Sequence, residues 1–188
     1  MKLAIIGRGK LSWLAEEILT GYEIEFFDDM HPELQNTEAS LHEKVFISIG
    51  HNQVRKQLFS IYHNREIISV VSKNAVVSKL ALIGKGAFVN NFCSIHAHAK
   101  LGLGCLVHPN TVIDVGATIG DFCRFGSQVH IAENVSIGDG CIVGSGVVVL
   151  PNVSIGSNCE VCAGAVVTRS FGDNETIAGS PARSVKVS

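Results

Sequence analysis

The chain has 188 residues, which is enough for two small domains or one large one. Charged residues make up only 17% of it and the formal net charge is -2, so a basic surface for nucleic acid or an anionic membrane is not expected. The sequence lacks the run of about 18 apolar residues that a membrane helix needs. Its start, MKLAIIG, does not resemble a signal peptide, so we expect a cytoplasmic protein.

The first 72 residues predict a small, Rossmann-like α/β domain. Apolar runs at 2–6, 22–27, 45–50 and 67–71 predict strands, and periodic apolar residues at 11–19 and 52–62 predict helices. The first strand ends in Gly7-Arg8-Gly9-Lys10. A glycine turn that opens a helix presents backbone N–H groups, which suit a phosphate. A tight turn without a ligand explains Gly7 about as well, because the third glycine of a dinucleotide-binding turn is not at its usual place.

Residues 75–170 repeat every six positions. An apolar residue, usually Val or Ile, recurs at each sixth position from Val77 to Val167, and a small or β-branched residue stands two positions earlier. This pattern predicts short strands separated by sharp bends, which is the signature of a parallel β-helix. Three hexapeptides form one triangular coil, so residues three repeats apart should stack about 4.8 Å from each other. We therefore expect an all-β domain over residues 73–188.

Four of the six cysteines follow the same register. Cys105, Cys123, Cys141 and Cys159 recur once per coil at the inward, small position. We expect them to form a buried column of reduced thiols, as small apolar residues do in a reducing compartment. A metal site is not expected, because the single CxxC pair, Cys159 and Cys162, places one thiol inward and the other at a corner.

Further markers flank or precede the repeat. They are Gly7-x-Gly9, Phe27-Asp28-Asp29, Ile49-Gly50-His51-Asn52 with Arg55, and Gly179-Ser180-Pro181-Ala182-Arg183. Together with the hexapeptides, they resemble the left-handed β-helix sugar acyltransferases. That family includes N-acetyltransferases of nucleotide-linked amino sugars and sialic-acid O-acetyltransferases. The resemblance implies a left-handed coil, a homotrimer with acetyl-CoA in a groove between neighbouring coils, and a first domain (1–72) that holds the nucleotide of the sugar.

The same resemblance gives individual residues expected roles. Those expected to bind the nucleotide sugar are Gly7, Gly9, Asp28, Asp29 and Asn52, and those expected to bind acetyl-CoA are Ser145, Ala163, Arg169 and Arg183. Arginine suits the CoA phosphates because its hydrogen bonds to phosphate oxygens are bidentate and charge-assisted.

Acetyl transfer to an amine needs a base, and histidine is the usual one because its pKa lies near neutrality. The family places that histidine where this chain has Val115. The coil spacing instead stacks His96 on Asp114, a contact that would orient the imidazole and raise its basicity. His108 stands at a corner one hexapeptide before Asp114. We therefore expect His108 to be the base, supported by Asp114, with His96 as the second candidate.

Two more groups, and two other functions, stay open. His130 should point outward from the face that carries Asp114, and Glu133 stacks above Val115 and could take a proton if it is desolvated. Corner residues with structural roles alone would give the same pattern. The main hypothesis is an acetyl-CoA-dependent N-acetyltransferase of a nucleotide-linked amino sugar for surface glycans. The alternatives are a non-catalytic or altered homologue, as Val115 suggests, and an O-acetyltransferase of a sialic-acid-like sugar.

Overall fold

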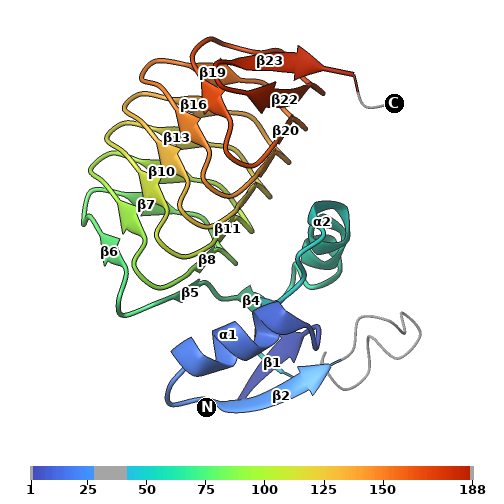
Figure 1. The fold of residues 1–188 in the computed structure, drawn as a ribbon. Coiled ribbons are helices and arrows are strands. Elements are labelled where there is room, and N and C mark those ends of the chain that lie inside the picture. Colours follow the sequence, from blue (N-terminus) through green and yellow to red (C-terminus); the bar gives the residue numbers. More distant parts are fainter. Residues whose placement is uncertain (1, 28–41, 187–188) are drawn as a thin grey trace.

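The computed structural model describes residues 2–27 and 42–186. Figure 1 shows a triangular coil that rises from a small N-terminal unit, with α2 beside the flank of the coil. The fold is mostly β, with parallel sheets and two helices among the described residues. The predicted substrate residues Asp28 and Asp29 lie outside the described residues.

The N-terminal unit is a four-stranded parallel sheet in the order β2-β1-β3-β4. Its elements are β1 (Lys2–Ile6), α1 (Lys10–Ile18), β2 (Glu23–Phe27), β3 (Lys44–Ile47), α2 (Asn52–Ile61) and β4 (Glu66–Ile67). Alternation along β1 sends Leu3 and Ile5 into one apolar cluster and Ala4 and Ile6 into another, so both faces of the sheet are covered. Neither helix is long and apolar enough to cross a membrane.

The coil has three sheets of stacked two-residue strands, except that its last two strands, Thr176–Gly179 and Ala182–Val185, have four residues each and pair antiparallel. The docking face is β5 (Val70–Val71), β8 (Phe88–Val89), β11 (Leu106–Val107), β14 (Arg124–Phe125), β17 (Ile142–Val143), β20 (Glu160–Val161), β22 (Thr176–Gly179) and β23 (Ala182–Val185). The histidine face is β6 (Val76–Val77), β9 (Ser94–Ile95), β12 (Val112–Ile113), β15 (His130–Ile131), β18 (Val148–Val149) and β21 (Val166–Val167). The third face is β7 (Leu82–Ile83), β10 (Lys100–Leu101), β13 (Thr118–Ile119), β16 (Ser136–Ile137) and β19 (Ser154–Ile155).

The register of the coil is the one that the hexapeptides predict. On each face a strand pairs in parallel with the strand one coil later, as Ile113 does with Ile131. The cysteine column is buried, and each thiol donates to a carbonyl of the next coil, as Cys123 does to Gly138 O at 3.1 Å. Hydrogen bonds to neighbouring thiols, together with burial, raise the pKa of Cys123 and Cys141. These thiols therefore stay protonated at neutral pH.

One predicted strand is wrong. The apolar run at 67–71 forms two strands instead of one, because the chain changes sheets within it. β4 pairs with β3 in the N-terminal unit, whereas β5 pairs with β8 in the coil. Between them, the Ser69 hydroxyl donates to Gly84 O and accepts from the Ala87 N–H, which ties the crossing point to the coil.

The N-terminal unit packs on the first strands of the docking face. Phe88 and Leu106 occupy outward positions on this face, yet both are fully buried in a cluster with Leu3, Ile5 and Phe46. The rings of Phe46 and Phe88 lie 6.2 Å apart. Burial of each such side chain contributes about 1.5–3 kcal/mol, so this interface is part of the fold.

Arg55 on α2 joins the two units. Its guanidinium is completely buried and donates to Gly104 O at 2.7 Å and Phe122 O at 3.0 Å, both on coil turns. It also donates to Ile49 O and to the Asn52 amide oxygen, at 2.8 Å each. Burial lowers the pKa of Arg55 to about 10, so the side chain stays charged at neutral pH.

At the corner beside α2, two successive coils have room only for glycine. Gly86 and Gly104 have φ of +67° and +58°, and a Cβ on Gly86 would lie 2.2 Å from the ring of Phe59. One coil above Gly104, Phe122 meets Phe59 edge to face at 5.0 Å. The absence of side chains at the first two levels lets α2 approach the coil closely.

We predict that Arg55→Met lowers the free energy of unfolding by about 3 kcal/mol or more, because it leaves several buried carbonyls without donors. Urea denaturation measures the change. Arg65→Met, at an arginine beyond the end of α2, serves as the control and should cost less than about 1 kcal/mol. Equal losses in the two variants would contradict the role of Arg55.

Candidate active site

A pocket crosses the docking face beside the N-terminal unit. Its two parts have volumes of about 300 and 310 Å³, and they share Arg124 on β14 and Ile142 on β17. The inner pocket is also lined by Gly50, His51, Asn52, Gln53, Gly140, Asn158, Cys159 and Glu160. The outer pocket is also lined by His108, Gly126, Ser127, Val143, Gly144 and Ser145. The pocket thus runs from the start of α2 to the corner between the docking and histidine faces.

The predicted glycine turn lies next to the inner end of this pocket. Gly7 is buried with φ +105°, and a Cβ there would lie 2.6 Å from Ile49 Cδ1 and 3.0 Å from Ser48 O. The turn is therefore pressed against the chain that leads into Gly50 at the pocket wall. Gly9 is the N-cap of α1 and has open space where a side chain would be. A ligand could approach that backbone closely.

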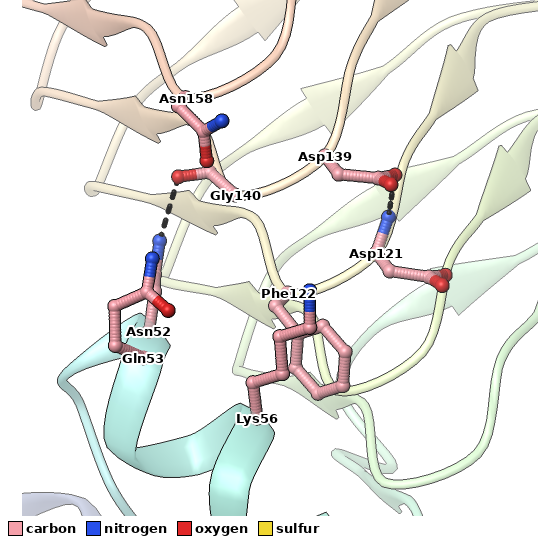
Figure 2. Close-up of a pocket in the computed structure, with 8 residues that line it drawn as sticks. All are labelled: Asn52, Gln53, Lys56, Asp121, Phe122, Asp139, Gly140 and Asn158. Carbon is pink, nitrogen blue, oxygen red and sulfur yellow. Dashed lines mark hydrogen bonds between the residues drawn. The ribbon is translucent and has the colours of Figure 1, made fainter.

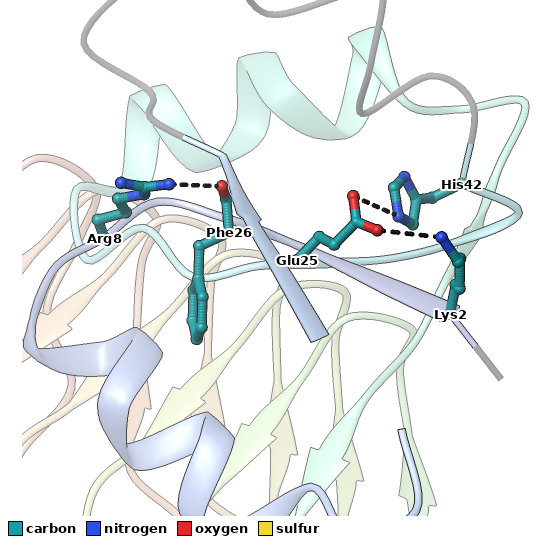
Figure 3. Close-up of polar contacts among 5 residues, drawn as sticks. All are labelled: Lys2, Arg8, Glu25, Phe26 and His42. Atoms are coloured by element: carbon teal, nitrogen blue, oxygen red, sulfur yellow. Dashed lines mark hydrogen bonds and ion pairs between the residues drawn. The ribbon is translucent and has the colours of Figure 1, made fainter. Parts of the chain in front are cut away.

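Polar contacts hold the outer strand of the same sheet (Figure 3). Arg8, in the glycine turn, donates to Phe26 O at 3.0 Å. Glu25 on β2 accepts from Lys2 at 3.3 Å and lies 3.3 Å from His42 Nε2. The contacts of Glu25 fix β2 to the start of β1 and to the segment before β3, whereas the bond from Arg8 fixes β2 beside the turn that is expected to meet the nucleotide.

Asn52, which is expected to bind the nucleotide sugar, lines the inner pocket, but its amide already has protein partners. The nitrogen donates to Gly140 O at 3.0 Å and the oxygen accepts from Arg55. Figure 2 shows this bond in a smaller neighbouring pocket, which Lys56 and Phe122 also line. Asn52 therefore docks α2 on the coil and shapes the pocket wall.

His108 is half-buried in the outer pocket, at the corner that follows β11. Burial lowers its pKa, and the positive charge of Arg124 lowers it further. An imidazole with a lowered pKa is neutral at pH 7 and can accept a proton. The geometry thus gives His108 the protonation state that a base needs.

The histidine face carries a second cluster. His96 Nδ1 and Asp114 Oδ1 are 2.8 Å apart, which confirms the stacking that the coil spacing predicts. His130 Nε2 lies 3.9 Å from the other carboxylate oxygen. The Val115 N–H and His96 lower the pKa of Asp114, which is therefore a carboxylate at neutral pH. No group of three or more His, Cys, Asp or Glu in the described part of the chain is arranged to hold a metal.

The predicted support of His108 by Asp114 is not found within one chain. One hexapeptide separates them, so they occupy successive corners of the triangle at opposite ends of β12 (Val112–Ile113). The carboxylate bonds instead to His96, one full coil away. Val115, where the family histidine is expected, is 42% exposed at the Asp114 corner. Glu133 is exposed too, so it lacks the desolvation that would make it a base.

The predicted acetyl-CoA residues lie at two places. Ser145 and Ala163 are exposed on one corner column, close over Gly126 and Gly144, and Ser145 lines the outer pocket together with His108. Arg169 and Arg183 lie on the last coil. The Arg169 guanidinium stands 5.3 Å from the centre of the Phe171 ring, and Arg183 donates to Ala182 O.

Sequence reasoning missed Arg124, which borders both pockets. It occupies an ordinary outward position of the repeat, between Leu106 and Ile142 in neighbouring strands. A comparison of outward residues one coil apart could have identified it. In the series Phe88, Leu106, Arg124 the first two are apolar, and Arg124 is the first charged residue.

The fold and the repeats define the class of the protein. Residues 116–150 match the family described as bacterial transferase hexapeptide (six repeats), and residues 152–169 match the hexapeptide repeat of succinyl-transferase. These matches and the fold support an acyltransferase built on hexapeptide repeats, as the sequence indicates.

Two solved structures of acetyltransferases are similar to this chain over nearly its whole length. A mutant perosamine N-acetyltransferase from Caulobacter crescentus, in complex with CoA and GDP-perosamine, is 26% identical with a TM-score of 0.91, over 100% of this chain and 98% of that one. The acetyltransferase domain of PglB from Neisseria gonorrhoeae, in complex with acetyl coenzyme A, is 25% identical with a TM-score of 0.89, over 98% of each chain.

A curated relative is an uncharacterised protein of Acanthamoeba polyphaga mimivirus, 37% identical over 60 residues. That match spans 32% of this chain and 12% of the viral protein.

The lowered pKa of His108 predicts how stability depends on pH. An unfolded histidine binds a proton with a pKa of about 6.5, whereas folded His108 resists protonation. The unfolded state therefore binds more protons than the folded state as the pH falls below that value, and the free energy of unfolding decreases.

His108→Asn should lose less stability than the parent protein between pH 7.5 and 5.5, measured by urea denaturation. His98→Asn, at an exposed corner, should follow the parent, and identical curves for both variants would contradict the prediction.

Proposed function

We propose that this protein transfers the acetyl group of acetyl-CoA to the amine of a nucleotide-linked amino sugar, in the cytoplasm. The Rossmann-like unit (1–72) would hold the nucleotide sugar and the coil (73–188) the acetyl-CoA. One observation carries the proposal: two pockets that share Arg124 and Ile142 lie side by side, one at the loop beside the glycine turn and the other at His108 and Ser145. The structures with CoA and GDP-perosamine, or with acetyl coenzyme A, support the same pair of substrates.

The reaction needs few groups from the protein. The amine nitrogen attacks the thioester carbonyl carbon, a C–N bond forms, and the C–S bond breaks with its electron pair on the sulfur of CoA. The nitrogen gives up one proton to a base, and the sulfur gains one as the free thiol. A base positioned within hydrogen-bond reach contributes about 10²–10⁴-fold to such a step.

His108 is the base in this proposal. It lines the pocket between the two expected ligands, it is half-buried, and its pKa is lowered, so it is neutral before the attack. His96 and Asp114 form the second element, a hydrogen-bonded pair on the adjoining face. Because Asp114 and His108 stand at different corners of one chain, we propose that the pair acts across an interface between subunits.

The enzyme would act as a homotrimer. The resemblance implies a groove for acetyl-CoA between neighbouring coils, and cyclic symmetry would bring a corner of one chain to a face of the next. Ser145 and Ala163 are exposed on such a corner. We therefore expect light scattering at micromolar concentration to give three times the mass of the chain. A monomer would contradict both the trimer and a shared acetyl-CoA site.

Activity variants test the function itself. The purified protein, given acetyl-CoA and UDP- or GDP-linked amino sugars, should release free CoA and form an N-acetyl sugar that mass spectrometry detects. His108→Ala should lower kcat by about 10²–10⁴-fold with little change in CoA affinity. His96→Ala should have a smaller effect, acting through Asp114.

Other outcomes would select the alternatives. Full turnover in the double variant His96→Ala, His108→Ala would remove both histidines as bases. Acetylation of a sialic-acid-like hydroxyl, with no amine product, would indicate an O-acetyltransferase. Binding of CoA and a nucleotide sugar without any transfer would mean that Val115 marks a homologue with lost or altered chemistry.

A further inference from the structure

Arg124 stands at the junction of the two pockets. It lines both, with Ile142 beside it on the next strand. Its Nη1 would be 3.9 Å from a Cβ on Gly50, so the guanidinium reaches the loop that connects β3 to α2. That loop touches the glycine turn at Gly7 through Ile49. A ligand that extends from the glycine turn to His108 therefore passes Arg124.

Among the residues that the structure describes, the guanidinium of Arg124 has no bonded acidic partner. No ion pair or side-chain hydrogen bond involves it within residues 2–27 and 42–186. Its neighbours on the docking face, Leu106 and Ile142, are apolar and provide no acceptor. A half-buried cation without a counter-ion loses hydration and gains nothing in return, which is an arrangement typical of ligand sites.

A second unbalanced cation reinforces this charge. Arg55 is fully buried, and it donates to carbonyls and to the Asn52 amide, so no carboxylate neutralises it. The two arginines are close enough for Arg124 to lower the pKa of Arg55. Two cations without a bonded carboxylate therefore lie near the α2 side of the inner pocket, while its one acidic lining residue, Glu160, stands two strands away from Arg124.

We propose that Arg124 binds the sugar-linked phosphate of the nucleoside diphosphate and so fixes where the acceptor amine lies relative to His108. This inference rests on the proposed function and adds the residue that selects a nucleoside diphosphate. Arginine matches a phosphate because its planar fork donates two hydrogen bonds to two oxygens. The phosphate lies between nucleoside and sugar, as Arg124 lies between the glycine turn and His108.

The test compares ligands that differ by one phosphate. Isothermal titration calorimetry should show that Arg124→Gln weakens binding of UDP or GDP at least tenfold, whichever the protein prefers. Binding of the matching monophosphate, UMP or GMP, and of CoA should change less than threefold. Arg124→Lys should recover part of the loss, since it keeps the charge without the fork. In turnover assays with a nucleotide amino sugar, KM should rise more than kcat falls.

The controls separate this inference from the proposed function. Lys100→Gln removes one positive charge from the third face and should bind every ligand like the parent protein. If the parent binds diphosphate and CoA but Arg124→Gln does so equally well, only the role of Arg124 is wrong. Loss of CoA binding, or a loss seen only with a uronic-acid nucleotide sugar, would assign Arg124 to another anion and overturn the proposal. If the parent binds no nucleoside diphosphate, both the inference and the nucleotide part of the function fail.

Discussion

The hydrogen bonds of Arg55 hold the two parts of this molecule in one arrangement. A buried guanidinium must have its donors satisfied, and here they meet carbonyls of two coil turns, carbonyls of the β3–α2 loop and the amide of Asn52. The interaction sets the height at which α2 meets the coil. It therefore also sets the distance between the glycine turn and the outer pocket, on which any transfer between two bound substrates depends.

A solenoid converts sequence spacing into spatial contact, which is why so much of the coil follows from the sequence. Residues one coil apart stack, so the contact between His96 and Asp114 and the column of cysteines could both be predicted from spacing alone. The N-terminal elements follow from ordinary periodicity, with small shifts at their ends. The exception is the run at 67–71, where the chain passes from one sheet to another. The apolar pattern continues across that point, so it could not indicate the change of sheet.

Contacts between the two units have no periodicity, and sequence reasoning could not find them. Arg55 resembles a surface residue of an amphipathic helix, yet it is fully buried because Gly86 and Gly104 let α2 approach. Arg124 resembles any outward residue of the repeat, and only the position of the N-terminal unit makes it part of a pocket. His108 and Asp114 do not pair within one chain for a related reason, since residues one hexapeptide apart lie at successive corners of the triangle.

The coils of the solenoid differ in whether another coil could be inserted beside them. The levels of Phe88, Leu106, Arg124 and Ile142 carry the interface and the pocket, so an extra coil inserted among them would separate groups that must work together. The next coil still lines the inner pocket, through Asn158, Cys159 and Glu160. A whole turn could therefore be added only beyond Glu160 without separating the residues of the two pockets, which leaves the last coil as the one place where the solenoid can change length.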